Sequence, residues 1–262
     1  MATTSHLPRR GLWQDKVAVV TGAAAGIGAA IAERGAAEGG DVWLVDVDVR
    51  GGAVAAAITA SGHRGRFLEV DVTDATRVEH GVSEVLDRSG GVDIIVNSAG
   101  RDSHADPATM TSDEWDRFMT LDLKASWLTV RAALPAMIDR GAGSVVNIAS
   151  LHATLTAEGA FPYAAAKAEL LGLTRSLALD LGRHGVRVNA VSPGWTRSER
   201  IEAHFSDIGR EATRRIEDLH ALRRTARPQE VAEVAVFLAS DRASFVTGAN
   251  WAVDGGLGAR YA

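Results

Sequence analysis

The chain has 262 residues, of which 46% are hydrophobic and 23% are charged. This balance is typical of a globular protein with a sizeable core, and it excludes a largely disordered chain. The formal net charge of −5 provides no electrostatic basis for binding nucleic acid or an anionic membrane surface. There is no cysteine, which excludes disulfides, thiolate nucleophiles and cysteine-ligated metals.

Residues 1–13 are not expected to carry a targeting signal. Residues 1–13 contain no apolar segment of the length that a secretory signal needs, and no later run approaches the length of a membrane span. We therefore expect residues 1–13 to form a flexible N-terminal arm on a cytoplasmic protein. No composition shift or linker divides the rest, so we expect 14–262 to form a single domain.

Short apolar runs alternate with helical stretches along the chain. Strands are expected at 17–20, 42–45, 66–70, 92–96, 145–148, 186–191 and, more briefly, 253–256. Helices are expected at 26–38, 51–61, 113–140 and 163–184. Such alternation predicts right-handed crossovers and an α/β fold with a single Rossmann-like, doubly wound parallel sheet. It would have about seven strands and helices on both faces.

A glycine-rich turn joins the first expected strand to the first expected helix. Residues 21–28 have the spacing Gly-x-x-x-Gly-x-Gly, in which small residues let backbone amides approach a pyrophosphate at a helix N-terminus. Such turns also occur without a ligand, but here Asp46 ends the next strand. A carboxylate at that position can accept both adenosine ribose hydroxyls and would repel a 2′-phosphate, so NAD is favoured over NADP.

Three side chains in the middle of the sequence indicate proton transfer. Tyr163 and Lys167 are four residues apart, which places them on one face of a helix, and Ser150 follows the strand expected at 145–148. A phenol is a weak base at neutral pH. A neighbouring ammonium group favours its anionic form, which suits it to exchange a proton with an alcohol or a carbonyl oxygen. The same pair is also an ordinary amphipathic pattern on surface helices, so its meaning depends on the other motifs.

Together these motifs resemble those of the short-chain dehydrogenase/reductase family, over about residues 16–256. The resemblance implies that Ser150 holds the substrate oxygen, that Tyr163 exchanges the hydroxyl proton, and that Lys167 binds the nicotinamide ribose. Further motifs match in family order after the third, fourth and sixth expected strands. The residues that the resemblance implies for cofactor binding are Gly22, Ala25, Gly26, Ile27, Gly28, Asp46, Asp71, Val72, Asn97, Ala99, Gly100, Ile148, Tyr163, Lys167, Pro193, Gly194, Trp195, Thr196 and Ser198.

One position departs from the family pattern. Asp122 stands where the family usually has an asparagine that holds a water in a proton relay to the active-site lysine. An aspartate keeps the acceptor atoms but loses the amide donor and adds a negative charge. Near Lys167 this charge would oppose the Tyr163 phenolate, so we expect a pH optimum higher than that of an Asp122→Asn variant. The alternative is that Asp122 bonds a backbone group in its own helix.

The resemblance places the substrate pocket among residues 101–105 and 151–161, with a lid at about 197–227. His152 in this region is able to touch a polar substrate, although an uninvolved loop histidine is the more common case. The residues expected to contact the substrate are Ser150, Tyr163, His152 and Trp195.

We therefore expect an NAD-dependent enzyme that transfers a hydride between the cofactor and a secondary alcohol or ketone. A cyclic dihydrodiol or a sugar-like polyol is the alternative substrate, and a non-catalytic dinucleotide-binding regulator is the alternative of another class. The histidines show no metal-binding spacing, and Ser150 lacks the Gly-x-Ser-x-Gly turn of hydrolases. By resemblance, the helices at 113–140 and 163–184 would form a homotetramer or a dimer.

Overall fold

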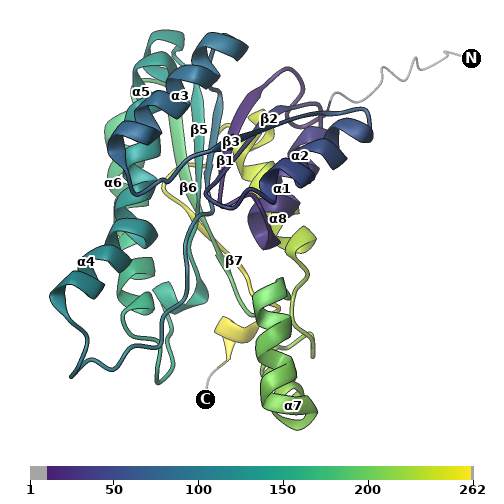
Figure 1. Ribbon diagram of the computed structural model, residues 1–262, viewed down its shortest axis with the longest axis vertical. Coiled ribbons are helices and arrows are strands. Elements are labelled where there is room, and N and C mark those ends of the chain that lie inside the picture. The colour runs from purple at the N-terminus through teal and green to yellow at the C-terminus, as the bar shows by residue number, and fades with distance from the viewer. Residues whose placement is uncertain (1–10, 261–262) are drawn as a thin grey trace, which may run out of the picture.

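The computed structural model describes residues 11–260, which form a parallel sheet of seven strands with helices on both faces (Figure 1). The strands are β1 (Val17–Thr21), β2 (Asp41–Asp46), β3 (Arg64–Glu69), β4 (Ile94–Asn97), β5 (Gly143–Ile148), β6 (Val186–Pro193) and β7 (Asn250–Val253). Their order across the sheet is β3-β2-β1-β4-β5-β6-β7, and every neighbouring pair is parallel. The predicted doubly wound, Rossmann-like fold is confirmed.

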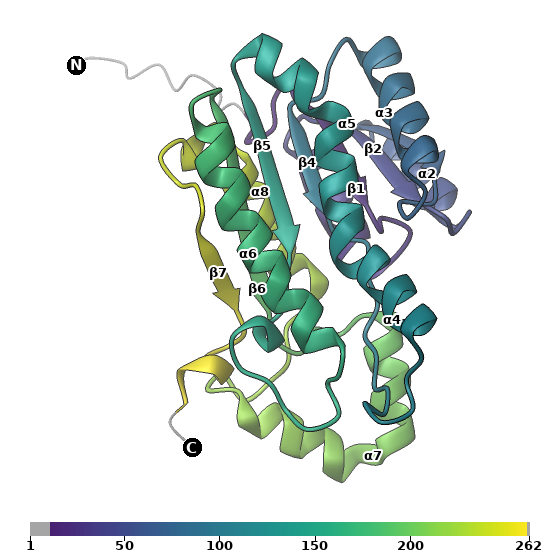
Figure 2. The ribbon, with the colours of Figure 1, turned by 90° about the vertical axis from the view of Figure 1, so that its left-hand side faces the viewer.

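Two groups of helices enclose the sheet. One face carries α1 (Gly26–Ala37), α2 (Gly51–Ala60) and α8 (Pro228–Ala239), and the other carries α3 (Ala75–Ser89), α5 (Ala125–Arg140) and α6 (Tyr163–Gly182) (Figure 1). A π-helical turn at Thr120–Lys124 joins α4 (Ser112–Met119) to α5. The helix α7 (Glu199–Leu219) crosses beyond one end of the sheet (Figure 2). Short 3₁₀ turns lie at Leu151–Ala153, Asp241–Ala243 and Leu257–Ala259.

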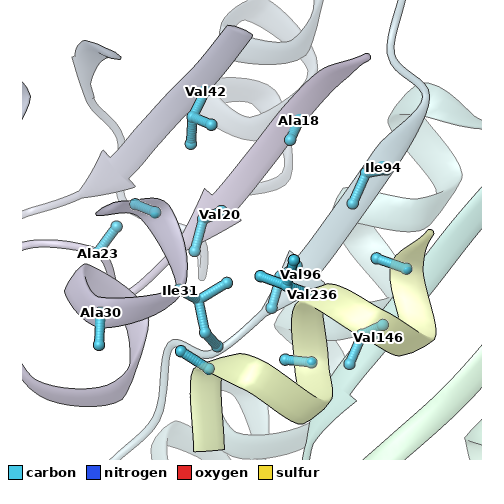
Figure 3. Close-up of a cluster of buried hydrophobic side chains, with 14 of the residues drawn as sticks. Ala18, Val20, Ala23, Ala30, Ile31, Val42, Ile94, Val96, Val146 and Val236 are labelled. Atoms are coloured by element: carbon cyan, nitrogen blue, oxygen red, sulfur yellow. The ribbon is translucent and has the colours of Figure 1, made fainter. Parts of the chain in front are cut away.

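The core between the sheet and its first helical layer explains the apolar runs in the sequence. Ile31 of α1 and Val236 of α8 are fully buried against the central strands (Figure 3). Strands that are covered on both faces bury every side chain, so they appear as continuous β-branched runs rather than as alternating patterns. The strand side chains in this cluster include Ala18, Val20, Val42, Ile94 and Val96.

The expected boundaries are least accurate at the two edges of the sheet. The last strand was expected at 253–256, but β7 spans Asn250–Val253, and β3 begins at Arg64 rather than at residue 66. Residues 250–252 of β7 are exposed and Arg64 at the start of β3 is exposed, so no buried apolar run marks either one. The helix expected at 113–140 is interrupted by the π-helical turn.

The expected end of the N-terminal arm, at residue 13, lies too late in the chain. Trp13 is 0% exposed, and its Nε1 donates a hydrogen bond to the carbonyl oxygen of Val236 at 3.0 Å. Its ring fills the space beside Gly35, where a Cβ atom would lie only 2.0 Å from the indole. Residues 11–13 therefore belong to the folded domain, and positions 1–10 of the expected arm lie outside the described residues.

No helix within residues 11–260 combines the length and the apolar composition that crossing a membrane requires. Over the same part of the chain, no three histidine or carboxylate side chains gather as the ligands of a metal ion would.

Candidate active site

A cavity of about 1220 Å³ opens where β1, β2, β4, β5 and β6 end. Its walls come from the turns that follow these strands and from the first turn of α7. The chain reverses its direction of progress across the sheet between β1 and β4, and ligands of open α/β sheets bind at such switch points. The topology alone therefore makes this cavity the candidate site.

The glycine turn forms one wall of the cavity. Gly22 has a φ of +65°, and a Cβ atom there would lie 2.7 Å from the backbone of Ala99, so only glycine fits. No side chain caps the N-terminus of α1, which begins at Gly26. The first backbone N–H groups of α1 are therefore available to an anionic ligand, as a pyrophosphate would require.

Backbone hydrogen bonds fix the Asp46 carboxylate at the edge of the cavity. Its Oδ2 accepts the N–H of Ala24 at 2.9 Å, and its Oδ1 accepts the N–H of Asp48 at 3.0 Å. Arg50, the first cation after Asp46, is already paired with Asp48 at 2.7 Å and with Glu199 at 3.1 Å. This end of the cavity therefore presents an oriented carboxylate beside a neutralised arginine.

Ser150, Tyr163 and Lys167 line the opposite part of the same cavity from their positions after β5 and in α6. Ser150 is 7% exposed, and its Oγ accepts the N–H of His152 at 3.2 Å, which leaves the hydroxyl proton free for another acceptor. The Nζ of Lys167 lies 5.5 Å from the centre of the Tyr163 ring and donates to the carbonyl oxygen of Ile148 at 3.5 Å. The expected helical pairing of phenol and ammonium is therefore present.

Asp122 lies beneath this group and does not line the cavity. Its side chain is fully buried, its Oδ1 is 3.3 Å from the Nζ of Lys167, and both carboxylate oxygens accept the N–H of Arg101 at 3.2 Å. Burial raises the pKa of Asp122, and Lys167 together with the Arg101 N–H opposes that rise. Gly100 covers the pair, since a Cβ there would lie 2.8 Å from Asp122 Oδ1. The partners of Asp122 thus lie outside its own helix, contrary to the alternative considered from the sequence.

Comparison with known proteins decides the family. A family model described as enoyl-(acyl carrier protein) reductase matches residues 22–258. The chain is 39% identical over 247 residues to cis-4-hydroxycyclohexanecarboxylate dehydrogenase of Sinomonas cyclohexanicum, with 92% of this chain and 96% of that protein covered. The chain belongs to the short-chain dehydrogenase/reductase family. The family binds a nicotinamide cofactor, and this chain is an oxidoreductase that acts on CH–OH groups.

Two more similar proteins support this short-chain dehydrogenase/reductase assignment. D-threitol dehydrogenase of Mycolicibacterium smegmatis is 37% identical over 243 residues, with 92% of each chain covered. The solved structure of levodione reductase superposes with a TM-score of 0.89 at 33% identity, covering 95% of this chain and 100% of that chain. Similarity therefore extends over nearly the whole length in both sequence and structure.

One residue that the family motifs had assigned to the cofactor lies elsewhere. Asn97 is buried, its Nδ2 donates to Asn147 Oδ1 at 2.9 Å, and its Oδ1 accepts the Thr129 hydroxyl at 2.6 Å. The expectation that Asn97 lines the cavity was wrong, because its amide completes a buried polar network between β4, β5 and α5. All the other residues expected to contact the cofactor do line the cavity.

Several contacts that shape the site of this short-chain dehydrogenase/reductase were not expected from the sequence. The Oγ1 of Thr21 accepts the N–H groups of Ser98 and Ala99, both at 3.1 Å, and so ties the turn after β1 to the turn after β4. Thr21 is the first residue of the glycine motif, and this position is the sequence feature from which its contacts could have been predicted. No local sequence pattern predicts the pairing of Arg50 with Glu199, because 149 residues separate the two.

The segment expected to form a lid contains α7. A parallel β-bridge joins Thr196 to Ala226 and so holds the two ends of this segment together. Trp195, which directly precedes Thr196 in the chain, stacks on His204 with ring centres 5.8 Å apart and an interplanar angle of 14°. Arg200 in the first turn of α7 forms an ion pair with Asp102 at 2.8 Å, and both residues line the cavity.

Proposed function

We propose that this protein is an NAD-dependent dehydrogenase or reductase of secondary alcohols and ketones, with Ser150, Tyr163 and Lys167 as its catalytic residues. The observation that carries the proposal is the convergence of these three side chains on the cavity that the glycine turn and Asp46 also line. The names of the relatives support this substrate class, because hydroxycyclohexanecarboxylates and threitol are both secondary alcohols.

The residues around the cavity fit a nicotinamide dinucleotide. The open N-terminus of α1 would hold the pyrophosphate, and the Asp46 carboxylate would accept the adenosine ribose hydroxyls. The same carboxylate would repel a 2′-phosphate, and Arg50 is occupied by Asp48 and Glu199, so NAD is the proposed form. The bound cofactor supplies a ring that accepts a hydride in the oxidising direction and returns it in the reducing direction.

The proton transfer follows from the side chains themselves. Ser150 receives the His152 N–H and is free to donate its own proton to the substrate oxygen, which fixes that oxygen beside Tyr163. Tyr163 as phenolate removes the hydroxyl proton during oxidation, and as phenol it returns the proton during reduction. The Lys167 ammonium lies 5.5 Å from the centre of the Tyr163 ring and would bind the nicotinamide ribose. General base catalysis of this kind contributes about 10²–10⁴-fold.

We also propose a homo-oligomer, a tetramer rather than a dimer, assembled through α4, α5 and α6. Trp127 on α5 is 38% exposed and Leu179 on α6 is 84% exposed, so both would bury apolar surface in such an interface. We propose in addition that residues 197–227 act as a lid over the substrate. The contact of Arg200 with Asp102 supports this role, because it links the segment to the opposite wall of the cavity.

NADH formation over a panel of secondary alcohols tests the proposed function. The Tyr163→Phe variant keeps the ring but loses the titrating hydroxyl, and we expect its kcat to fall by about 10²–10⁴-fold. Binding of NADH, followed by its fluorescence, is the control for folding and should survive in the variant. Turnover that persists in Tyr163→Phe would refute the proton-transfer role, and NADH binding without turnover of any alcohol would favour the non-catalytic regulator.

A further inference from the structure

His152 lies beside the two groups that hold the reacting oxygen. Its ring packs edge-on against Tyr163, with ring centres 5.7 Å apart and an interplanar angle of 74°. Its backbone N–H is bonded to Ser150 Oγ, and its side chain lines the cavity. A substrate held by Ser150 and Tyr163 would therefore carry its next carbon close to the imidazole of His152.

A neighbouring threonine occupies one of the two ring nitrogens of His152. His152 Nδ1 is 3.0 Å from Thr156 Oγ1, so this nitrogen already has a partner. Nε2 is the ring nitrogen left for a ligand, and a hydroxyl group pairs with it in either tautomer, because a hydroxyl both donates and accepts. Burial lowers the pKa of His152, with His104 acting in the same direction, so the ring is neutral at neutral pH.

Two leucines close to His152 in the chain, Leu151 and Leu155, line the cavity together with it. A ring nitrogen that a substrate shields from water loses a hydrogen bond unless the substrate supplies one. Sites built in this way reject analogues that lack the matching hydroxyl group.

We propose that His152 is a specificity-determining residue whose Nε2 forms a hydrogen bond with a second hydroxyl group of the substrate. The preferred substrates are then secondary alcohols with a hydroxyl group on the neighbouring carbon. This inference rests on the proposed alcohol oxidation. A 4-hydroxycyclohexanecarboxylate has no hydroxyl group on the neighbouring carbon, so the preferred substrate differs from the one for which one relative is named.

The test compares kcat/KM for 1,2-cyclohexanediol, as cis and trans isomers, with kcat/KM for cyclohexanol. We expect the wild-type protein to favour at least one diol isomer by about 10–100-fold. His152→Phe keeps an aromatic ring against Tyr163 but removes the ring nitrogen, so the diol-to-alcohol ratio should fall to near unity. His152→Gln supplies an amide that donates and accepts hydrogen bonds, and it should retain part of the preference. His80→Phe, on the exposed face of α3, is the matched control and should leave the ratio at the wild-type value.

The outcomes separate this inference from the proposed function. Equal oxidation of the diols and cyclohexanol by the wild-type protein, or an unchanged ratio in His152→Phe, overturns the inference and leaves the proposed function standing. Oxidation of 4-hydroxycyclohexanecarboxylate in preference to both diols overturns it as well. NADH formation from none of these alcohols overturns both. If His152→Phe fails to bind NADH, His152→Leu gives the same comparison without the larger ring.

Discussion

Replacing Asp122 with asparagine should move the acid limb of the pH–rate profile for alcohol oxidation to lower pH. The Asp122 carboxylate lies 3.3 Å from Lys167 Nζ, which lies 5.5 Å from the Tyr163 ring centre, so the charge acts within about 9 Å of the phenol. At that separation, an effective dielectric constant of about 20–40 gives an interaction of about 1–2 kcal/mol. This energy corresponds to a displacement of about 1 pH unit.

The sign follows from the charges that face the carboxylate. Lys167 contacts Asp122 from α6 and Arg101 contacts it from the loop after β4, while the Tyr163 ring centre lies 5.5 Å from Lys167 Nζ. A negative charge at position 122 offsets part of the ammonium potential, so it opposes the base form of the active site. Removing that charge therefore allows oxidation at lower pH.

The assay is the pH dependence of kcat and kcat/KM for NADH formation across the neutral and alkaline range. Asp113→Asn removes the same charge from the exposed surface of α4 and is the matched control. A purely structural role for Asp122 would lower activity equally at every pH. Superimposable profiles for the wild-type protein and Asp122→Asn, or a displacement to higher pH, would refute the electrostatic reasoning.

Three further predictions concern stability and cofactor choice. Arg187→Met should lower the free energy of unfolding by about 2–4 kcal/mol, because the guanidinium donates to the last carbonyls of α8, including Leu238 O at 2.8 Å. Arg224 lowers the pKa of Glu230 to about 2, so Glu230→Gln should lose about 1 kcal/mol at neutral pH after solvent screening. That loss should shrink as pH falls below the ordinary glutamate value of 4.5 towards 2. Asp46→Ser should raise the ratio of kcat/KM for NADP to that for NAD by about 10-fold or more, since it removes a charge facing the 2′-phosphate.

Denaturant unfolding and steady-state kinetics check these predictions. Arg175→Met, which replaces an exposed arginine of α6, is the control for Arg187 and should unfold like the wild-type protein. A Glu230→Gln deficit that stays constant between neutral pH and pH below 4.5 would contradict the ion-pair explanation. An unchanged cofactor ratio in Asp46→Ser would show that this carboxylate does not select NAD.

The interior of the sheet was predictable and its edges were not. The runs at 17–20 and 145–148 are buried on both faces, and burial on both faces leaves a continuous β-branched pattern in the sequence. β3 and β7 pair on one side only, so polar residues are tolerated and the pattern fades. The π-helical turn at 120–124 contains Asp122, whose pairing with Lys167 is a tertiary contact that local propensity does not contain.

The candidate site was predictable where one short motif carries its residues. The glycine turn and the Tyr163 to Lys167 spacing are local, and the structure brings both to one cavity. Asn97 illustrates the limit, because a polar residue at a strand end serves equally well as a ligand contact or as part of a buried network, and its partners decide which. The pairing of Asp102 with Arg200 joins residues 98 positions apart, and no local pattern records it.

The burial of Trp13 has a consequence for biosynthesis. Its indole bonds to the carbonyl of Val236 and packs beside Gly35, so its site is completed only when α8 is present. On a ribosome, α8 emerges near the end of synthesis, and until then the Trp13 side chain lacks part of its binding site in the core. The first βα units of the nascent chain must therefore avoid aggregation while the rest of the chain is synthesised. Fragments that end before α8 should accordingly depend on chaperones, whereas the full-length chain closes the core with its own C-terminal third.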